Sequence, residues 1–217
     1  LRTPGEGDHA RIAAAVAELL AGQNADGGFG GDGDATTATL LKLLDLGCDL
    51  GARGGRTAGG ALVRMVDAGV TARAAPGGAT TLPMSADDAR ALCGLGATTP
   101  ALHQTLRWYA DNVDVWMEDG CPWGQAATIA TLAAGRAVTD VEDGLREALT
   151  RVVDDVNGAG CIGQRDPWAY VEVAAATDHP LAGVILRKQL TLLLRAQDAD
   201  GGWTMPEWWP TRQSSKV

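Results

Sequence analysis

In the middle of the chain an aspartate and a cysteine are separated by a single glycine, Asp119-Gly120-Cys121. Pro122 follows directly, and proline is favoured in the first turn of a helix because its missing N–H has no intrahelical partner there. Cys121 is therefore expected at a helix N-terminus, where the helix dipole favours the thiolate. Carboxylate and thiolate are both ligands of tetrahedral Zn²⁺, so these two residues are candidate zinc ligands. The alternative is that Asp119 and Cys121 cap a helix and pack a turn.

A second group of candidate residues lies at the starts of two predicted helices. It consists of the aromatic residues Trp123, Trp168 and Tyr170, with Asp166 close to the latter two. Aromatic faces stabilise carbocations by cation–π attraction, and they bind apolar tails by burial. The alternative is that these rings fill gaps between helices in an alanine-rich core.

The elements that must position these residues are predicted to be helices. Alanine and leucine at helical spacing dominate the sequence, and β-branched alternating runs are short, so an all-α fold is expected. Glycine-rich turns recur about fifty and then about forty residues apart, which is the period of a helical repeat. The helices predicted before the turns span 8–22, 57–68, 100–112, 140–156 and 180–196. Those predicted after the turns span 34–46, 85–96, 122–135 and 167–177.

Two copies of one short sequence, Gln-x-Ala-Asp-Gly-Gly-aromatic, lie near the two ends of the chain. The first copy is residues 23–29 and the second is residues 197–203. Each copy follows an Ala/Leu-rich stretch with helical period, so two equivalent helices are expected to end in equivalent turns.

Local signals mark several helix ends. Asp34 is predicted to be an N-cap, and Gly47 is predicted to end the same helix in the left-handed conformation. Ser85 with Asp88 three residues later predicts a capping box. Gly144 lies inside a predicted helix, where glycine costs about 1 kcal/mol relative to alanine.

Composition limits the classes of function. At 217 residues, the chain is expected to form a single domain, 1–217, with a full-sized core. A net charge of −9 without a basic block argues against nucleic acid and against an anionic membrane surface. No stretch approaches the ~20 apolar residues of a membrane span. The four cysteines are scattered, which predicts free thiols in a cytoplasmic protein and not a disulfide scaffold.

The turns and the repeated sequence resemble the QW repeats of terpenoid cyclases and of the β-subunits of protein prenyltransferases. Gln197, Gly202 and Trp203 fit that repeat, and the first copy has Phe29 in place of Trp. The resemblance implies an α/α toroid, in which the helices after the turns form an inner ring around an apolar cavity. A closed barrel of that superfamily has six helix pairs. This chain offers five outer and four inner helices, about nine in all, so a reduced toroid, or one that lacks its C-terminal closing helices, is expected.

The resemblance also implies roles for the candidate residues. Asp119-Gly120-Cys121 is similar to the D-G-C segment of protein prenyltransferases, in which Asp and Cys bind zinc. The histidine ligand of that family follows an Arg-Asp pair, and the matching place after Arg165-Asp166 holds Ala169. The histidines of this chain fall on predicted outer helices, at His9, His103 and His179. The implied set of zinc ligands is therefore incomplete.

Class II terpenoid cyclases protonate an alkene with the middle aspartate of an Asp-x-Asp-Asp motif. The sequence Ser85-Ala86-Asp87-Asp88 lacks the first aspartate, and Asp140-Val141-Glu142-Asp143 has Glu in the third place. We therefore interpret Asp87 and Asp88 as first-turn charges that the helix dipole stabilises.

Two hypotheses of function follow. The first is a cyclase-like or prenyltransferase-like enzyme that handles an isoprenoid in an apolar central cavity. Its polar chemistry would fall to Asp119, Cys121 and Asp166, and its substrate contacts to Trp123, Trp168 and Tyr170. The second is a non-catalytic α/α toroid whose cavity or concave face binds a lipid or a partner protein. A second protein chain that completes the barrel is a further expected partner under either hypothesis.

Overall fold

The structure is a computed structural model, and it describes residues 6–49, 53–119, 122–159, 170–171, 174–175, 177–195 and 197–202. These residues are mostly helical, so the predicted all-α class is confirmed. The helices are α1 (Glu6–Ala21), α2 (Gly33–Asp45), α3 (Arg53–Asp67), α4 (Ala86–Gly94), α5 (Pro100–Asp111), α6 (Val113–Asp119), α7 (Pro122–Gly135), α8 (Glu142–Ala159) and α10 (Pro180–Arg195). Strands β1 (Arg73–Ala74) and β2 (Thr81–Leu82) pair as a short antiparallel hairpin.

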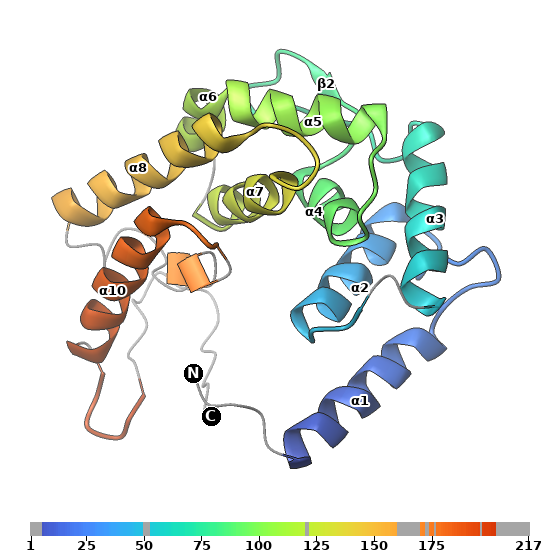
Figure 1. Cartoon of the computed structure of the whole chain (residues 1–217), viewed down its shortest axis with the longest axis horizontal. Helices are drawn as coiled ribbons and strands as arrows, with labels where there is room; N and C mark the ends of the chain where they lie inside the picture. The colour runs from blue at the N-terminus through green and yellow to red at the C-terminus, as the bar shows by residue number, and fades with distance from the viewer. Residues whose placement is uncertain are drawn as a thin grey trace.

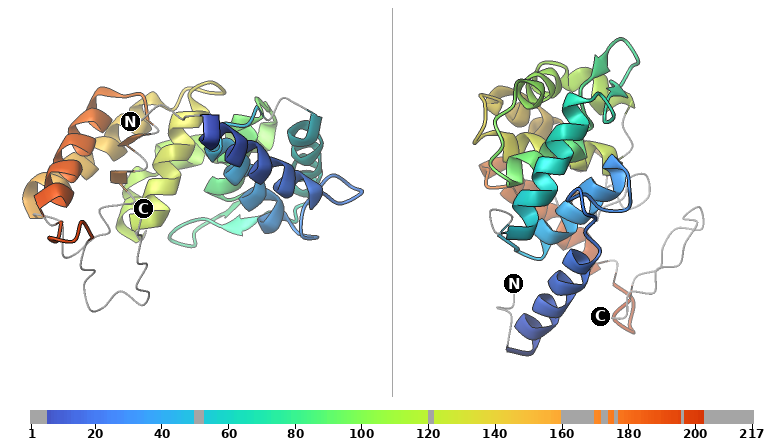
Figure 2. Two further views of the ribbon diagram at one scale, coloured as in Figure 1. Left: turned by 90° about the horizontal axis from the view of Figure 1, so that it is seen from below. Right: turned by 90° about the vertical axis from the view of Figure 1, so that its right-hand side faces the viewer.

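The helices form an arc of two layers (Figure 1). Helices α2, α4 and α7 follow one another along the inner side, and α1, α3, α5, α8 and α10 lie along the outer side. Packing follows the same order, because α4 lies between α2 and α7, and α8 lies between α5 and α10. Among the described residues these helices make an open arc and not a closed ring. The right-hand view of Figure 2 shows that α1 projects from the body of the other helices.

The first copy of the repeated sequence folds into a turn that its own side chains hold. The Gly28 N–H donates to Asp26 Oδ1 at 2.9 Å, and Gln23 Nε2 donates to the Gly27 carbonyl at 2.8 Å. Gly27 has φ 91°, a conformation that residues with a Cβ rarely adopt. Phe29 then turns inward and is buried, which starts the inner layer at α2.

The second copy forms the same turn. The Gly202 N–H donates to Asp200 Oδ1 at 3.0 Å, and Gln197 Nε2 donates to the Gly201 carbonyl at 2.8 Å. Gly201 has φ 82°. The repeat in sequence is therefore a repeat in structure, and it closes α10 as it closes α1. Trp203, the aromatic residue of this copy, lies outside the described residues.

Two local predictions need correction. The N-cap of α2 is Asp32 and not Asp34, because the Ala35 N–H donates to Asp32 Oδ1 at 2.7 Å. Asp34 lies inside the first turn and pairs with Arg73 at 2.7 Å. Gly47 has φ 72°, so the predicted left-handed end of this helix is confirmed.

Helix α6 was not predicted. It begins after Asn112, and its backbone turns back toward α5. Trp116 secures it, because the indole N–H donates to the Tyr109 carbonyl at 2.8 Å and the ring is 2% exposed. No helix of the described chain is both long and apolar enough to cross a membrane.

One buried side chain of α10 makes no hydrogen bond to any described residue. Gln189 is 0% exposed, and neither its Nε2 nor its Oε1 has a hydrogen-bond partner in the described part of the chain. An unpaired buried amide costs about 1–3 kcal/mol. Gln189→Leu should therefore raise the free energy of unfolding by about 2 kcal/mol, measured by urea denaturation.

Gln125 is the matched control for Gln189. It is 2% exposed, but Nε2 donates to the Met117 carbonyl at 2.6 Å and Oε1 accepts from the Tyr170 hydroxyl at 2.7 Å. Gln125→Leu should destabilise the fold, because it removes the hydrogen bonds to the Met117 carbonyl and from the Tyr170 hydroxyl. Equal effects of the two substitutions would contradict this explanation.

Candidate functional site

The structure describes Trp123, Tyr170 and the backbone of Asp119 among the predicted site residues. Trp123 lies in the first turn of α7 and is 43% exposed, whereas Tyr170 is 1% exposed. Asp119 is the last residue of α6. Cys121, Asp166 and Trp168 lie outside the described residues, so their predicted roles are not tested. Among the described residues no group of three or more His, Cys, Asp or Glu side chains is placed to hold a metal ion, and the zinc site stays a prediction.

Tyr170 has a packing role. Its hydroxyl donates to the amide of Gln125, which in turn donates to the backbone of Met117. This chain of hydrogen bonds joins the segment at Tyr170 to α7 and α6. The exposed Trp123 is free of that network and presents its ring to solvent at the start of an inner helix.

A buried carboxylate joins two inner helices. Asp88 is 1% exposed and closes the predicted capping box, because its Oδ2 accepts from the Ser85 N–H at 3.0 Å and from the Ser85 hydroxyl at 2.8 Å. The hydroxyl of Thr37, on α2, donates to the other oxygen, Oδ1. The capping box is confirmed, and the structure adds the bond to α2, which local sequence does not reveal.

Asp87, beside it, has a different environment. Protein atoms around the carboxyl desolvate it and raise its pKa above the ordinary value of 3.8; Arg90 opposes this rise and Asp88 adds to it. Asp87 as a whole residue is nevertheless exposed to solvent. A carboxyl with a raised pKa retains its proton to higher pH, which is the property of a general acid.

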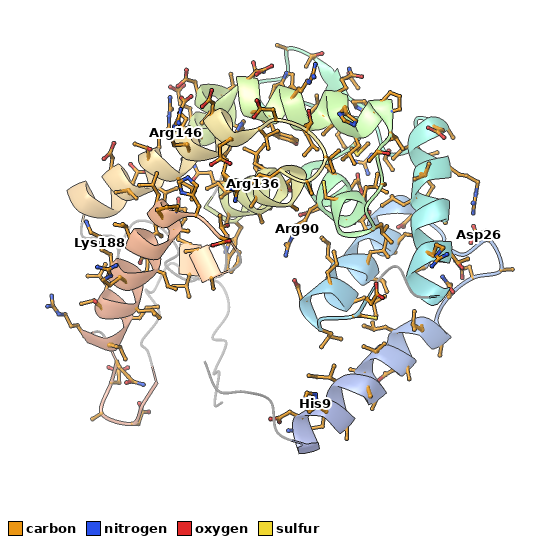
Figure 3. The ribbon with its side chains drawn as sticks, viewed as in Figure 1. His9, Asp26, Arg90, Arg136, Arg146 and Lys188 are labelled. Carbon is orange, nitrogen blue, oxygen red and sulfur yellow. The ribbon has the colours of Figure 1, made fainter. Side chains whose placement is uncertain are left out.

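The exposed side of α4 faces the inside of the arc. Its other sides pack against α2, α7, α3 and α5. Figure 3 shows Arg90 pointing from α4 into the open side, and its guanidinium pairs with Asp45 of α2 at 3.2 Å. Asp87 precedes Arg90 by three residues and so shares that face of the helix. From this spacing we expect Asp87, whose pKa is raised and whose nearest cation is Arg90, to lie toward the concave side.

Two other shifted groups are unsuited to acid or nucleophilic chemistry near neutral pH. Burial raises the pKa of the Cys93 thiol to about 11 and that of the Tyr109 hydroxyl to about 12. Cys93 is thus a thiol, and not the nucleophilic thiolate, at neutral pH. Tyr109 packs edge-on against Trp108, with ring centroids 5.3 Å apart. Asp87 is the remaining candidate among the described groups.

Sequence reasoning assigned Asp87 only a dipole role. The signal that could have found it is the Asp-Asp pair at a predicted inner-helix start, since one carboxyl of such a pair is needed for the cap and the other is not.

No family model, curated protein or solved structure matches this chain.

Proposed function

We propose that this chain is a terpenoid cyclase-like protein. In this proposal the arc is part of an α/α toroid, its concave side holds an isoprenoid, and Asp87 is the proton donor. The observation that carries the proposal is a partly desolvated carboxyl with a raised pKa, Asp87, in the first turn of an inner helix three residues before Arg90. The alternation of inner and outer helices and the two equal turns support the relation to the toroid.

The chemistry assigned to Asp87 is protonation of a carbon–carbon double bond. The carboxyl O–H bond breaks, the π-electron pair of the alkene forms the new C–H bond, and a tertiary cation remains on the neighbouring carbon. Asp87 is left as a carboxylate, which the Arg90 guanidinium stabilises. When the product cation loses a proton, that proton restores the acid. The exposed ring of Trp123, on the next inner helix, is the group suited to stabilise the cation.

A second candidate function is binding without turnover. The described helices leave the concave side open, and carbocation chemistry requires the exclusion of water. The prenyltransferase-like alternative depends on Asp119, Cys121 and Asp166, with zinc as the metal that these residues would share. Its ligand set is incomplete in the sequence.

Product analysis tests the proposal. Purified protein is incubated with squalene and with geranylgeranyl diphosphate, extracts are analysed by mass spectrometry, and binding is measured separately by calorimetry. We expect a cyclic product from one substrate, and a loss of about 100-fold or more in rate for Asp87→Asn, with unchanged affinity. Asp143→Asn is the matched control, because Asp143 also lies in a first turn with an arginine three residues on, at 2.6 Å, but on outer helix α8.

The outcomes separate the hypotheses. Binding of either ligand without any product supports the non-catalytic alternative and removes the acid role of Asp87. Failure of both ligands to bind overturns the isoprenoid proposal as a whole.

Asp87→Asn also has a predicted effect on the stability of the fold. Because the folded-state pKa of Asp87 is raised, folding favours the protonated carboxyl, and this contribution is lost as pH rises through that pKa. Folding therefore becomes less favourable as pH rises above the ordinary pKa of an aspartate carboxyl. Asp87→Asn should raise the melting temperature at pH 7 and give a smaller gain near pH 4. A decrease in stability of equal size at both pH values would indicate a structural role for Asp87.

A further inference from the structure

The last outer helix, α10, presents an apolar face that no described element covers. Leu190 is 42% exposed and Leu194 is 69% exposed, one turn apart. Arg187 and Arg195 lie on the exposed part of the same helix. With Lys188, α10 carries three basic residues and no acidic one. Its main described neighbour is α8.

The first outer helix, α1, has few contacts with the other described elements. None of its described side chains is fully buried. Val16, Leu19 and Leu20 are partly buried against the core of the same molecule, and half-buried Ile12 continues this apolar stripe toward the start of the helix. Its main described neighbour is α2, and the helix projects from the body of the arc (Figure 2). Helix α1 contains three acidic residues against one arginine, so its charge is opposite to that of α10.

The repeat relates these two helices. Three of the outer helices pack in succession, α5 on α8 and α8 on α10, and α1 and α10 end in the same hydrogen-bonded turn. An α1 helix from another molecule therefore has the shape of the next outer helix after α10.

We propose that α10 of one molecule binds α1 of a second copy of this chain, so that the outer layer continues from one molecule into the next. The contact joins two different surfaces and is heterologous. Leu190 and Leu194 supply the apolar centre, and the opposite charges of the two helices orient the pair. This inference does not depend on the proposed function.

Two blocked variants test the contact by sedimentation velocity over a range of concentrations. Leu190→Glu with Leu194→Glu blocks the α10 surface and leaves α1 intact. Asp8→Lys with Ile12→Lys blocks the α1 surface and leaves α10 intact. Val70→Glu is the control, because Val70 is 58% exposed but lies on neither helix. Far-UV circular dichroism and thermal unfolding verify that each variant is folded.

We expect the wild type and the Val70 variant to associate in a concentration-dependent way that high salt weakens. Each blocked variant alone should lose self-association completely, and their mixture should form a 1:1 complex through the one remaining pair of surfaces. Three results would overturn the proposal: a wild type that stays monomeric, a folded blocked variant that still self-associates, or a mixture that does not form the complex.

Discussion

Asp88→Ala should lower the free energy of unfolding by about 3–4 kcal/mol. The carboxylate accepts hydrogen bonds from the backbone and hydroxyl of Ser85 and from the hydroxyl of Thr37. Hydrogen bonds to a charged group each contribute about 1.5–3 kcal/mol, and loss of an N-cap interaction costs about 1 kcal/mol. Relief of the buried charge offsets part of this sum. Chemical denaturation of the variant measures the difference.

The bond between helices can be separated from the cap by a double-mutant cycle. Thr37→Val removes only the hydroxyl donor on α2, and Asp88→Ala removes the carboxylate that accepts from it. If Thr37 and Asp88 stabilise the fold together, the Thr37→Val/Asp88→Ala double variant will lose less stability than the sum of the single variants. Strict additivity would show that the contact between α2 and α4 contributes nothing beyond the cap.

Gly144→Ala should destabilise the protein by about 2–3 kcal/mol, although alanine is the better helix former. A Cβ on Gly144 would lie 2.5 Å from the carbonyl oxygen and 2.6 Å from the Cα of Ala110 on α5. Backbone atoms cannot rotate away as a side chain can, so α5 and α8 would have to separate. The cost of that overpacking exceeds the gain in helix propensity.

Gly183→Ala is the matched control for Gly144. Gly183 also lies near the start of an outer helix, but an added Cβ would meet nothing within 4 Å. Its substitution should raise stability by up to about 1 kcal/mol. Urea unfolding of the two variants, one below and one above the wild type, checks the explanation. A stabilising effect at Gly144 would show that the two helices are not held as close as described.

The helices and turns were predictable because their signals are local. Pro100, Pro122 and Pro180 each stand at the start of a helix, and the glycine of each Gln-x-Ala-Asp-Gly-Gly copy takes the left-handed conformation. The error at α2 is of the same local kind, since Asp32 and Asp34 are both good caps and only the hydrogen bond to Ala35 distinguishes them.

What the sequence could not provide is contact between distant segments. From the sequence, Gly144 only lowers the helix propensity of its segment. In the structure, its lack of a side chain lets the backbone of α5 pack closely against α8. Thr37 and Asp88 are 51 residues apart in the chain, and no local pattern connects them. Asp87 differs from Asp88 only in what surrounds each carboxyl. The chemistry of the candidate site therefore depends on tertiary packing that periodicity does not encode.

The arrangement of helices in an arc has a consequence for how firmly each part is held. Inner helix α4 is surrounded by α2, α7, α3 and α5, whereas each end of the outer layer has one main described neighbour. In such a near one-dimensional stack, local opening costs least at the ends and most at the centre. Amide protons of α4 should therefore exchange with solvent slowly, because only rare and extensive unfolding exposes them. Those of α1 should exchange quickly, through frequent local unfolding of that helix. The resistance of the native state to opening is thus a gradient along the chain, with its maximum at the helix that carries Asp87.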